Sequence, residues 1–318
     1  MINAKDRREF LLGAAGSLVA AGVLSRGVAL AATRKMKLDL HTGNIGVKAN
    51  LQQQIDYAAK YGFEAVDPNI NELAALSDSA LKQMLDDMAA KNLVFGFLAQ
   101  AVPVAQPDDR FAEWTKTSLI GWAKALQRAR MTRFCTWLTP SDARLTYLQN
   151  FKLHARRMTD VATVLGDHGI SFGLEYVGPK TSWASRKYPF IHTMESMKEL
   201  IAEMGKSNVG FLLDSWHWHN SGETPADILT LKNKDVVGVH LNDAPRDVPI
   251  DQLRDGQREI PLATGVIDAA GFVNALNQIG YDGPIAAEPL GSSVRSLPPD
   301  EALAKVAEVM KKAMDLIA

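Results

Sequence analysis

The chain has 318 residues, of which 47% are hydrophobic and 22% are charged, and this composition excludes a disordered, fibrous or multi-span membrane protein. Lys and Arg number 35 against 36 Asp and Glu, so the formal net charge of −1 excludes a general attraction to nucleic acid or to an anionic membrane. A small neutral or mildly anionic ligand fits this charge better. Cys135 is the only cysteine, which excludes an internal disulfide and a thiolate metal cluster.

Residues 1–31 differ from the rest of the chain and predict an export signal. The paired Arg7 and Arg8 precede an apolar run rich in Ala and Gly, and residues 29–31 form a small-residue cleavage pattern. The arginine pair resembles a twin-arginine signal, which exports folded bacterial proteins. A membrane anchor is the alternative, but Arg26 interrupts the run before the roughly 20 apolar residues that a span needs. We expect cleavage after Ala31, a periplasmic location and no stable membrane association.

From residue 36 onward, eight short apolar runs of β type alternate with eight longer segments of helical period. The strands are expected at 37–40, 65–67, 94–98, 133–138, 171–176, 209–214, 236–242 and 285–289. The helices are expected at 51–61, 79–91, 110–130, 143–167, 194–204, 226–231, 268–279 and 300–317. Strands joined by helical crossovers pair in parallel, and eight such units close a TIM barrel. We therefore predict a single (β/α)8 barrel domain over residues 32–318.

An open, doubly wound sheet is the structural alternative. That fold usually carries a glycine-rich phosphate loop after its first strand, and residues 39–46, DLHTGNIG, do not match GxGxxG. The longest irregular stretches, at 100–109, 178–192, 243–264 and 290–300, each follow a predicted strand. In a barrel these loops gather at the carboxyl-terminal face of the strands, where this fold places its chemistry.

Each of the last four predicted strands ends in a residue that can bind a metal, in the order Glu175, Asp214, His240 and Glu288. A carboxylate in such an apolar run is costly to bury unless a cation or a partner neutralises it. One strand-end carboxylate alone is more often a helix cap or a surface charge, but four residues placed alike argue against that interpretation. Oxygen and imidazole ligands suit a single divalent cation; we expect Mn²⁺ first, with Co²⁺, Zn²⁺ or Mg²⁺ as alternatives.

Side-chain alternation predicts what lies beneath these ligands. If they point into the barrel, so do the residues two positions earlier, and three of the four are small: Gly173, Gly238 and Ala286, with Leu212 as the exception. We expect this pattern to keep space below the metal, although a register shift of one residue would undo it.

These residues resemble the sugar isomerase and epimerase proteins of the xylose-isomerase-like TIM barrel superfamily, which also contains inosose dehydratases and endonuclease IV. In its ketose 3-epimerase branch, Glu, Asp, His and Glu at the ends of strands five to eight hold the metal. That branch also places a substrate-binding His three residues after the Asp and an Arg six residues after the metal His, here His217 and Arg246. Residues 260–268 resemble a Gly-x-Gly-x-Ile/Val-Asp stretch of the family, although Ala263 stands where a glycine is common.

The resemblance implies proton transfer beside a sugar carbonyl through an enediolate, with Glu175 and Glu288 as the catalytic acid and base. His217 and Arg246 would orient the substrate, although His217 could instead support a metal ligand. Four tryptophans, including Trp216, fall at or after strand ends, where they could stack on a sugar or simply pack the loops. The family often forms dimers or tetramers, so a homo-oligomer remains an alternative to a monomer.

Three other functions remain as alternatives. A keto-polyol dehydratase begins with the same proton abstraction but expels a hydroxyl group. A non-catalytic periplasmic protein could keep the metal for sugar recognition alone. An endonuclease IV-like activity is disfavoured, because three-metal sites need more histidines and the charge gives DNA no attraction. Three cations in the loop after strand five could bind a phosphate or carboxylate: Lys180, Arg186 and Lys187. Solvated loop charge is their more common role, so we expect a free or glycosidic sugar as the substrate.

Overall fold

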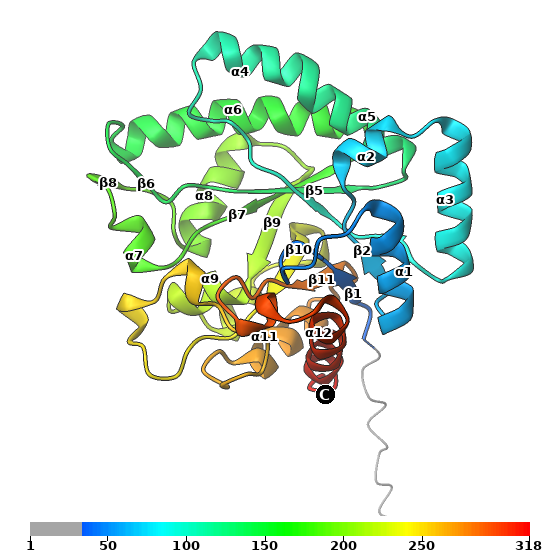
Figure 1. Ribbon diagram of the computed structural model, residues 1–318. Coiled ribbons are helices and arrows are strands. Elements are labelled where there is room, and N and C mark those ends of the chain that lie inside the picture. Colours follow the sequence, from blue (N-terminus) through cyan, green and yellow to red (C-terminus); the bar gives the residue numbers. More distant parts are fainter. Residues whose placement is uncertain (1–33) are drawn as a thin grey trace, which may run out of the picture. The chain divides into compact units, whose positions relative to one another are not determined.

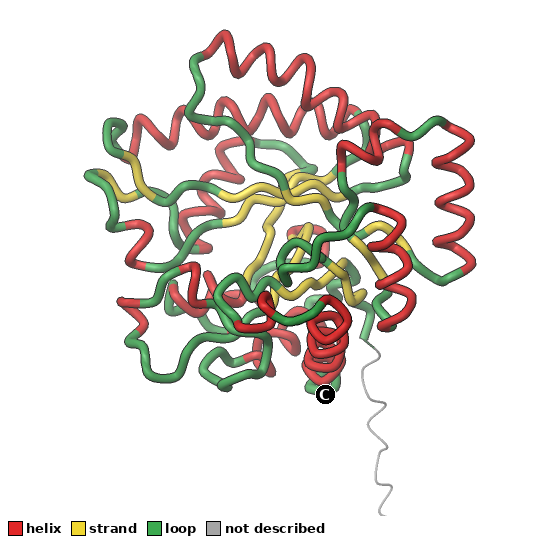
Figure 2. The backbone as a smooth tube through the Cα atoms, in the orientation of Figure 1, coloured by secondary structure: helices red, strands yellow, loops and turns green. Residues whose placement is uncertain are grey.

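The computed structural model describes residues 34–318, which form one compact unit, and the expected export signal lies outside the described residues. Its main sheet is parallel, with the order β3-β2-β1-β11-β10-β9-β7-β5-β4, and helices lie around the outside of the strands (Figures 1 and 2). The strands are β1 Lys37–Leu40, β2 Ala65–Val66, β3 Val94–Phe95, β4 Leu98–Ala99, β5 Arg133–Trp137, β7 Ser171–Glu175, β9 Val209–Asp214, β10 Val236–Leu241 and β11 Pro284–Ala287.

The two edges of this sheet, β3 and β4, are halves of one interrupted strand, so the sheet closes on itself. β3 pairs with β2 and β4 pairs with β5, and only Gly96 and Phe97 separate them. A Cβ atom on Gly96 would lie 1.9 Å from the Asp39 carboxylate, so glycine is needed where the chain passes β1. Counting β3 and β4 as one strand gives the eight predicted strands, which confirms the TIM barrel.

The predicted helices are all present, together with short ones that the sequence pattern did not indicate. The long helices are α1 Leu51–Tyr61, α3 Asp78–Ala90, α4 Asp108–Trp114, α5 Ile120–Arg128, α6 Tyr147–Asp167, α8 Met194–Met204, α11 Ala269–Gln278 and α12 Pro299–Met314. The unexpected short helices are α2 Ile70–Ala75, α7 Lys180–Trp183 and α9 Ser215–Asn220, whereas α10 Pro225–Ile228 is a shorter form of the helix expected at 226–231. A π-helical turn, Thr115–Leu119, joins α4 to α5 within the helix expected at 110–130.

The helix expected from residue 143 begins only at Tyr147, because the preceding residues form other structure. Ser141 and Asp142 make strand β6, Ser141–Asp142, which pairs antiparallel with β8, Tyr188–Pro189. The Asp142 carboxylate then accepts hydrogen bonds from the backbone N–H groups of Arg144 and Leu145, at 2.6 and 2.7 Å. The β6–β8 ribbon ties the loop after β5 to the loop after β7 at the rim of the barrel.

The inside of the barrel holds a small apolar cluster, separate from the larger core between strands and helices. It contains Phe97, Cys135, Leu212, Val237 and Ala286. Cβ atoms on Gly173 and Gly238 would lie 2.6 Å from Cys135 Sγ and 3.1 Å from Phe97, respectively. The small inward residues therefore make room for Phe97, Cys135 and Leu212, and the expectation of open space below the ligands is wrong.

Within residues 34–318, no helix is both long enough and apolar enough to cross a membrane.

Candidate metal centre

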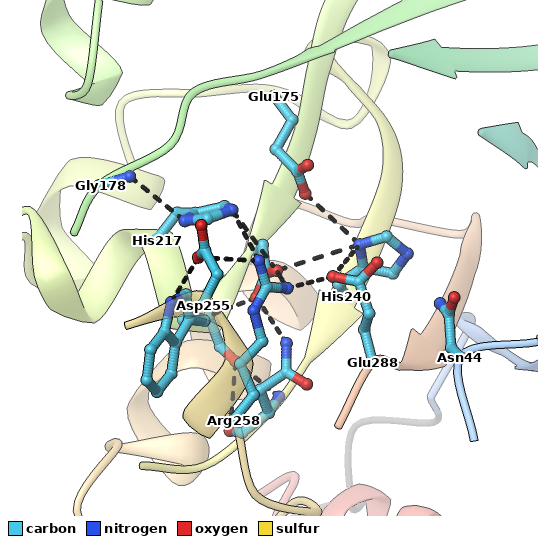
Figure 3. Close-up of polar contacts among 12 residues, drawn as sticks. Asn44, Glu175, Gly178, His217, His240, Asp255, Arg258 and Glu288 are labelled. Atoms are coloured by element: carbon cyan, nitrogen blue, oxygen red, sulfur yellow. Dashed lines mark hydrogen bonds and ion pairs between the residues drawn. The ribbon is translucent and has the colours of Figure 1, made fainter. Parts of the chain in front are cut away.

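The barrel brings Glu175, Asp214, His240 and Glu288 together at the carboxyl ends of four neighbouring strands. One ligand atom from each residue lies within 4.8 Å of the ligand atoms of the other three. His240 Nδ1 is 3.4 Å from Glu175 Oε1, 3.4 Å from Glu288 Oε2 and 4.0 Å from Asp214 Oδ2. Figure 3 shows Glu175 from above and Glu288 from below reaching the same ring nitrogen of His240, Nδ1. The arrangement is that of one mononuclear site with three oxygen ligands and one nitrogen ligand.

Burial and charge make this cluster suitable for a cation. Glu175, Asp214 and His240 are buried, and 16% of the Glu288 side chain is exposed. Three carboxylates with little solvent need positive charge nearby, because an unpaired buried carboxylate is strongly disfavoured. A divalent cation supplies that charge without a large side chain, and the donor set fits one.

The same crowding shifts the pKa values of Glu175, His240 and Glu288 in different ways. Burial, reinforced by the neighbouring carboxylates, raises the pKa of Glu175 to about 7. Burial would lower the pKa of His240, but Glu288, Glu175 and Asp214 around the ring outweigh it and raise that pKa to about 9. Burial would raise the pKa of Glu288, but His240 and Arg258 lower it below its ordinary value. The two glutamates therefore differ in how readily each takes up a proton.

Arg258 is a member of the site that the sequence did not indicate. Its Nη1 donates to Asp214 Oδ2 at 2.7 Å and to Glu288 Oε2, so it touches two of the four candidate ligands. Its Nη2 lies 3.1 Å from His217 Nε2 and donates to Asp255 at 3.2 Å. The guanidinium is buried, and it provides one positive charge against the three carboxylates.

An antiparallel backbone bridge carries Arg258 back to the barrel. The N–H groups of Asp243 and Glu259 each donate to the other residue's carbonyl, at 3.0 and 2.8 Å. The Asp243 carboxylate also accepts hydrogen bonds from the backbone N–H groups of Thr264, Gly265 and Ile267. The buried Asp243 carboxylate thus holds the long loop after β10 in place. Within this loop, Leu262 adopts a left-handed backbone conformation, with φ +65°.

His217 lies at the site on α9, which Asp214 caps by accepting the backbone N–H of Trp216 at 2.8 Å. Burial, together with the charge of Arg258, lowers the pKa of His217 well below its ordinary value, so the ring is neutral. Its Nδ1 is 3.2 Å from the N–H of Gly178, and its Nε2 faces Arg258. A neutral imidazole has one acceptor nitrogen, so it can satisfy only one of these two donors. The backbone N–H of Gly178 donates to Nδ1, so Nε2 carries the ring proton and is itself a donor.

Two of the expected substrate-binding residues are placed differently. The Trp216 ring is completely buried; its Nε1 donates to Asp255 at 3.1 Å and the ring packs beside Arg258. The expectation of an exposed stacking surface at Trp216 is therefore wrong, and the ring supports Arg258 instead. Arg246 is exposed and donates to the Thr264 carbonyl at 2.7 Å; within residues 34–318 it has no hydrogen bond or ion pair with the cluster.

A second buried pair lies next to His240. His41 Nε2 is 3.0 Å from Asp39 Oδ2, and the His41 ring meets His240 edge to face, with centroids 5.8 Å apart. Burial would lower the pKa of His41, but Asp39 and Asp67 raise it overall. The sequence showed His41 only as the first residue after a strand, with no repeated pattern to mark it.

Residues 55–313 match the sequence pattern of the xylose isomerase-like TIM barrel family. The chain belongs to this family. Among family relatives, the inosose isomerase of Bacillus velezensis is 22% identical over 258 residues, which cover 80% of this chain and 88% of that protein. The ketose 3-epimerase of Arthrobacter globiformis is 24% identical over 274 residues, which cover 81% of this chain and 85% of that protein.

The fold is also that of the IOLI protein, whose crystal structure contains a zinc atom. The TM-score is 0.74 at 19% identity, and the match covers 89% of this chain and 99% of that one. The relatives of this chain therefore include one protein named as an isomerase and one named as an epimerase.

Proposed function

We propose that this protein is a divalent-metal-dependent isomerase or epimerase of a sugar or keto-sugar. The observation that supports it most strongly is the cluster itself, in which Glu175 and Glu288 point toward each other across one set of ligand atoms (Figure 3). Two carboxylates on opposite sides of a bound carbon can remove a proton from one face and return it on the other. The names of the two relatives agree with this chemistry.

The four ligands Glu175, Asp214, His240 and Glu288 would hold the cation. When bound, it supplies positive charge that stabilises the enediolate oxygen of the substrate. Mn²⁺ is our first choice because the donor set is three oxygens and one nitrogen, and Co²⁺, Zn²⁺ and Mg²⁺ suit the same donors.

The chain's own residues would carry the proton. Glu175 and Glu288 would serve as the acid and base, one removing the proton and the other returning it. Arg258 and His217 present N–H donors beside them, where a substrate hydroxyl or carbonyl oxygen can be bound. We keep the sequence-based substrate role of His217, and we propose Arg258 for the orienting role expected of Arg246.

Hydrogen exchange tests this proposal. The protein, loaded with Mn²⁺ in D₂O, is incubated with a panel of free ketoses and glycosidic keto-sugars, and deuterium incorporation is followed by NMR. We expect exchange with the wild type and at least a hundredfold loss in Glu288→Gln with metal retained, because general acid-base catalysis contributes about 10²–10⁴-fold. Glu199→Gln, the same change at an exposed position on α8, is the matched control.

The products separate the alternatives. Isomerisation leaves the mass unchanged, whereas a dehydratase removes one water after the same exchange. Metal and sugar binding without exchange of any sugar in the panel would instead indicate a non-catalytic binding protein and would contradict the proposal.

We also propose that residues 1–31 export the folded protein to the periplasm. The support is the sequence alone, the arginine pair Arg7 and Arg8 and the following apolar run. Cell fractionation of the wild type and of an Arg7→Lys, Arg8→Lys variant tests it. Retention of the variant in the cytoplasm supports the proposal, and a wild type found in the cytoplasm refutes it.

A further inference from the structure

A pocket of about 320 Å³ lies at the rim of the barrel, beside the metal centre. Its wall is built from the loop after β4, from the end of β5 through β6, from the first turns of α6 and from the loop after β7. This volume is at the lower end of the range found for small-molecule sites. None of the candidate metal ligands lines the pocket, so its contents are a separate question from the metal.

Trp137 connects the pocket to the metal centre. It ends β5 and is the register partner of Glu175 on β7, so the two side chains leave neighbouring strands on the same side. Two residues earlier on β5, Cys135 lies in the apolar cluster inside the barrel, which shows that this side is the inward one. Trp137 is 46% exposed, unlike the buried Trp216, and it lines the pocket. The indole therefore borders the pocket and lies on the same inward side of the sheet as Glu175.

The lining of the pocket carries more positive than negative charge. Arg144 and Arg186 both line it, and neither has an ion pair within the described residues 34–318. Arg186 makes one long hydrogen bond, 3.5 Å to the Ser141 carbonyl. The one acidic residue of the lining is Asp142. Burial would raise the pKa of Asp142, but two backbone N–H groups and the nearby charges of Arg144 and Arg186 lower it. Two exposed guanidinium groups against one carboxylate leave a net positive charge that attracts an anion.

The floor of the pocket provides a neutral hydrogen-bond acceptor. His154 lines the pocket from α6, and its Nδ1 is 3.0 Å from the Asn150 carbonyl, so this nitrogen carries the proton. Burial lowers the pKa of His154 to about 4, which keeps the ring neutral and leaves Nε2 as an acceptor. Phe190 packs against the ring, with centroids 4.7 Å apart. A hydroxyl group fits this position better than a second anion.

The walls are held in place by buried contacts. Arg157 donates to the carbonyls of Val104 and Gln106 and to the Asp108 carboxylate, which fixes the loop after β4. Ser141 Oγ donates to the Ser182 carbonyl at 3.1 Å, next to the β6–β8 ribbon. The pocket is therefore part of the folded barrel, and it is preorganised for a ligand.

We propose that this pocket binds a carboxylate-bearing part of the substrate while the reacting carbon lies at the metal centre. Arg144 and Arg186 bind the carboxylate. Trp137 stacks on the sugar ring between the carboxylate and the metal centre, and His154 Nε2 accepts a hydrogen bond from a hydroxyl group. The substrate class is then acidic sugars, meaning sugar acids or glycosides with a carboxylate. This inference rests on the proposed function for the identity of the reacting part, but the anion site itself does not.

Binding measurements test the anion site without any reaction. Quenching of Trp fluorescence is titrated with glucuronate, with glucose and with glucose 6-phosphate, using the wild type, Glu288→Gln and an Arg144→Gln, Arg186→Gln variant. We expect the wild type to bind glucuronate at least threefold more tightly than glucose, and about tenfold if both guanidiniums engage. The double variant should lose this preference. An Arg110→Gln, Lys152→Gln variant, which removes two exposed charges outside the pocket, should keep it.

The outcomes separate this inference from the proposed function. Equal affinities for glucuronate and glucose, or a preference that survives in the double variant, overturn the anion site. Tighter binding of glucose 6-phosphate than of glucuronate overturns the carboxylate assignment and indicates a phosphate. A preference for glucuronate over glucose that persists in Glu288→Gln supports the pocket. If no sugar exchanges deuterium, the proposed function fails, but this binding result still supports the anion site.

Discussion

Replacing Arg258 by Met is the substitution for which the structure gives the clearest energetic expectation. The guanidinium is buried and donates to both Asp214 and Glu288, and Met keeps much of its length without its charge. Removing one partner of a buried charge pair costs about 3–5 kcal/mol because the remaining charges lose their compensation. At about 2–4 °C per kcal/mol, the metal-free variant should melt at least about 6 °C below the wild type.

The same substitution should strengthen metal binding. The Arg258 guanidinium takes the carboxylate oxygens that a divalent cation also needs, and its charge repels that cation. At an effective dielectric constant of 20, two unit charges 4 Å apart interact by about 4 kcal/mol, so relief of this repulsion should lower the Mn²⁺ Kd at least about tenfold.

Calorimetry of both proteins, with and without Mn²⁺, measures both effects. Arg246→Met is the matched control, because Arg246 is exposed and its one hydrogen bond is to a backbone carbonyl. A stability loss in Arg258→Met that is the same with and without Mn²⁺, together with an unchanged Kd, would refute the competition between Arg258 and the cation.

Two further predictions concern the barrel around the site. Gly173→Ala places a Cβ atom 2.6 Å from Cys135 Sγ and should lower the free energy of unfolding in urea by about 1–3 kcal/mol. The loss should be smaller in a Cys135→Ala background. An equal loss in both backgrounds would count against close packing between Gly173 and Cys135. Burial raises the pKa of Glu223 from 4.5 to about 7, so the unfolded chain loses this proton first and stability falls as pH rises between these values. Glu223→Gln should therefore gain up to about 3 kcal/mol relative to the wild type between pH 4.5 and pH 8, and a pH-independent difference would contradict this.

The four candidate ligands could be predicted because the same chemistry recurs at the ends of four successive buried strands. A strand fixes both the height and the direction of its last side chain, so position in the sequence translates directly into position in the barrel. The break between β3 and β4 at Gly96 could not be predicted in the same way. It depends on the close approach of Asp39, which lies on another strand.

The loop residues show where sequence spacing stops being informative. Arg246 follows His240 by the spacing typical of ketose 3-epimerases, but the loop after β10 leaves it exposed. Arg258 lies twelve residues further along and enters the site only because the Asp243–Glu259 bridge returns the chain to the barrel. Trp216 is buried because Asp214 caps α9 directly after the strand. The position of Arg258 depends on long-range backbone pairing and the burial of Trp216 on a local helix cap, and periodicity reports neither.

The most direct test is the anomalous diffraction of crystals grown with Mn²⁺, collected on both sides of the manganese absorption edge. A single strong anomalous peak bonded to Glu175, Asp214, His240 and Glu288, with the Arg258 guanidinium moved off Asp214 and Glu288, is the result that we predict. A peak elsewhere in the barrel, or no peak while Arg258 keeps both carboxylates, would contradict the assignment of this cluster as the metal centre.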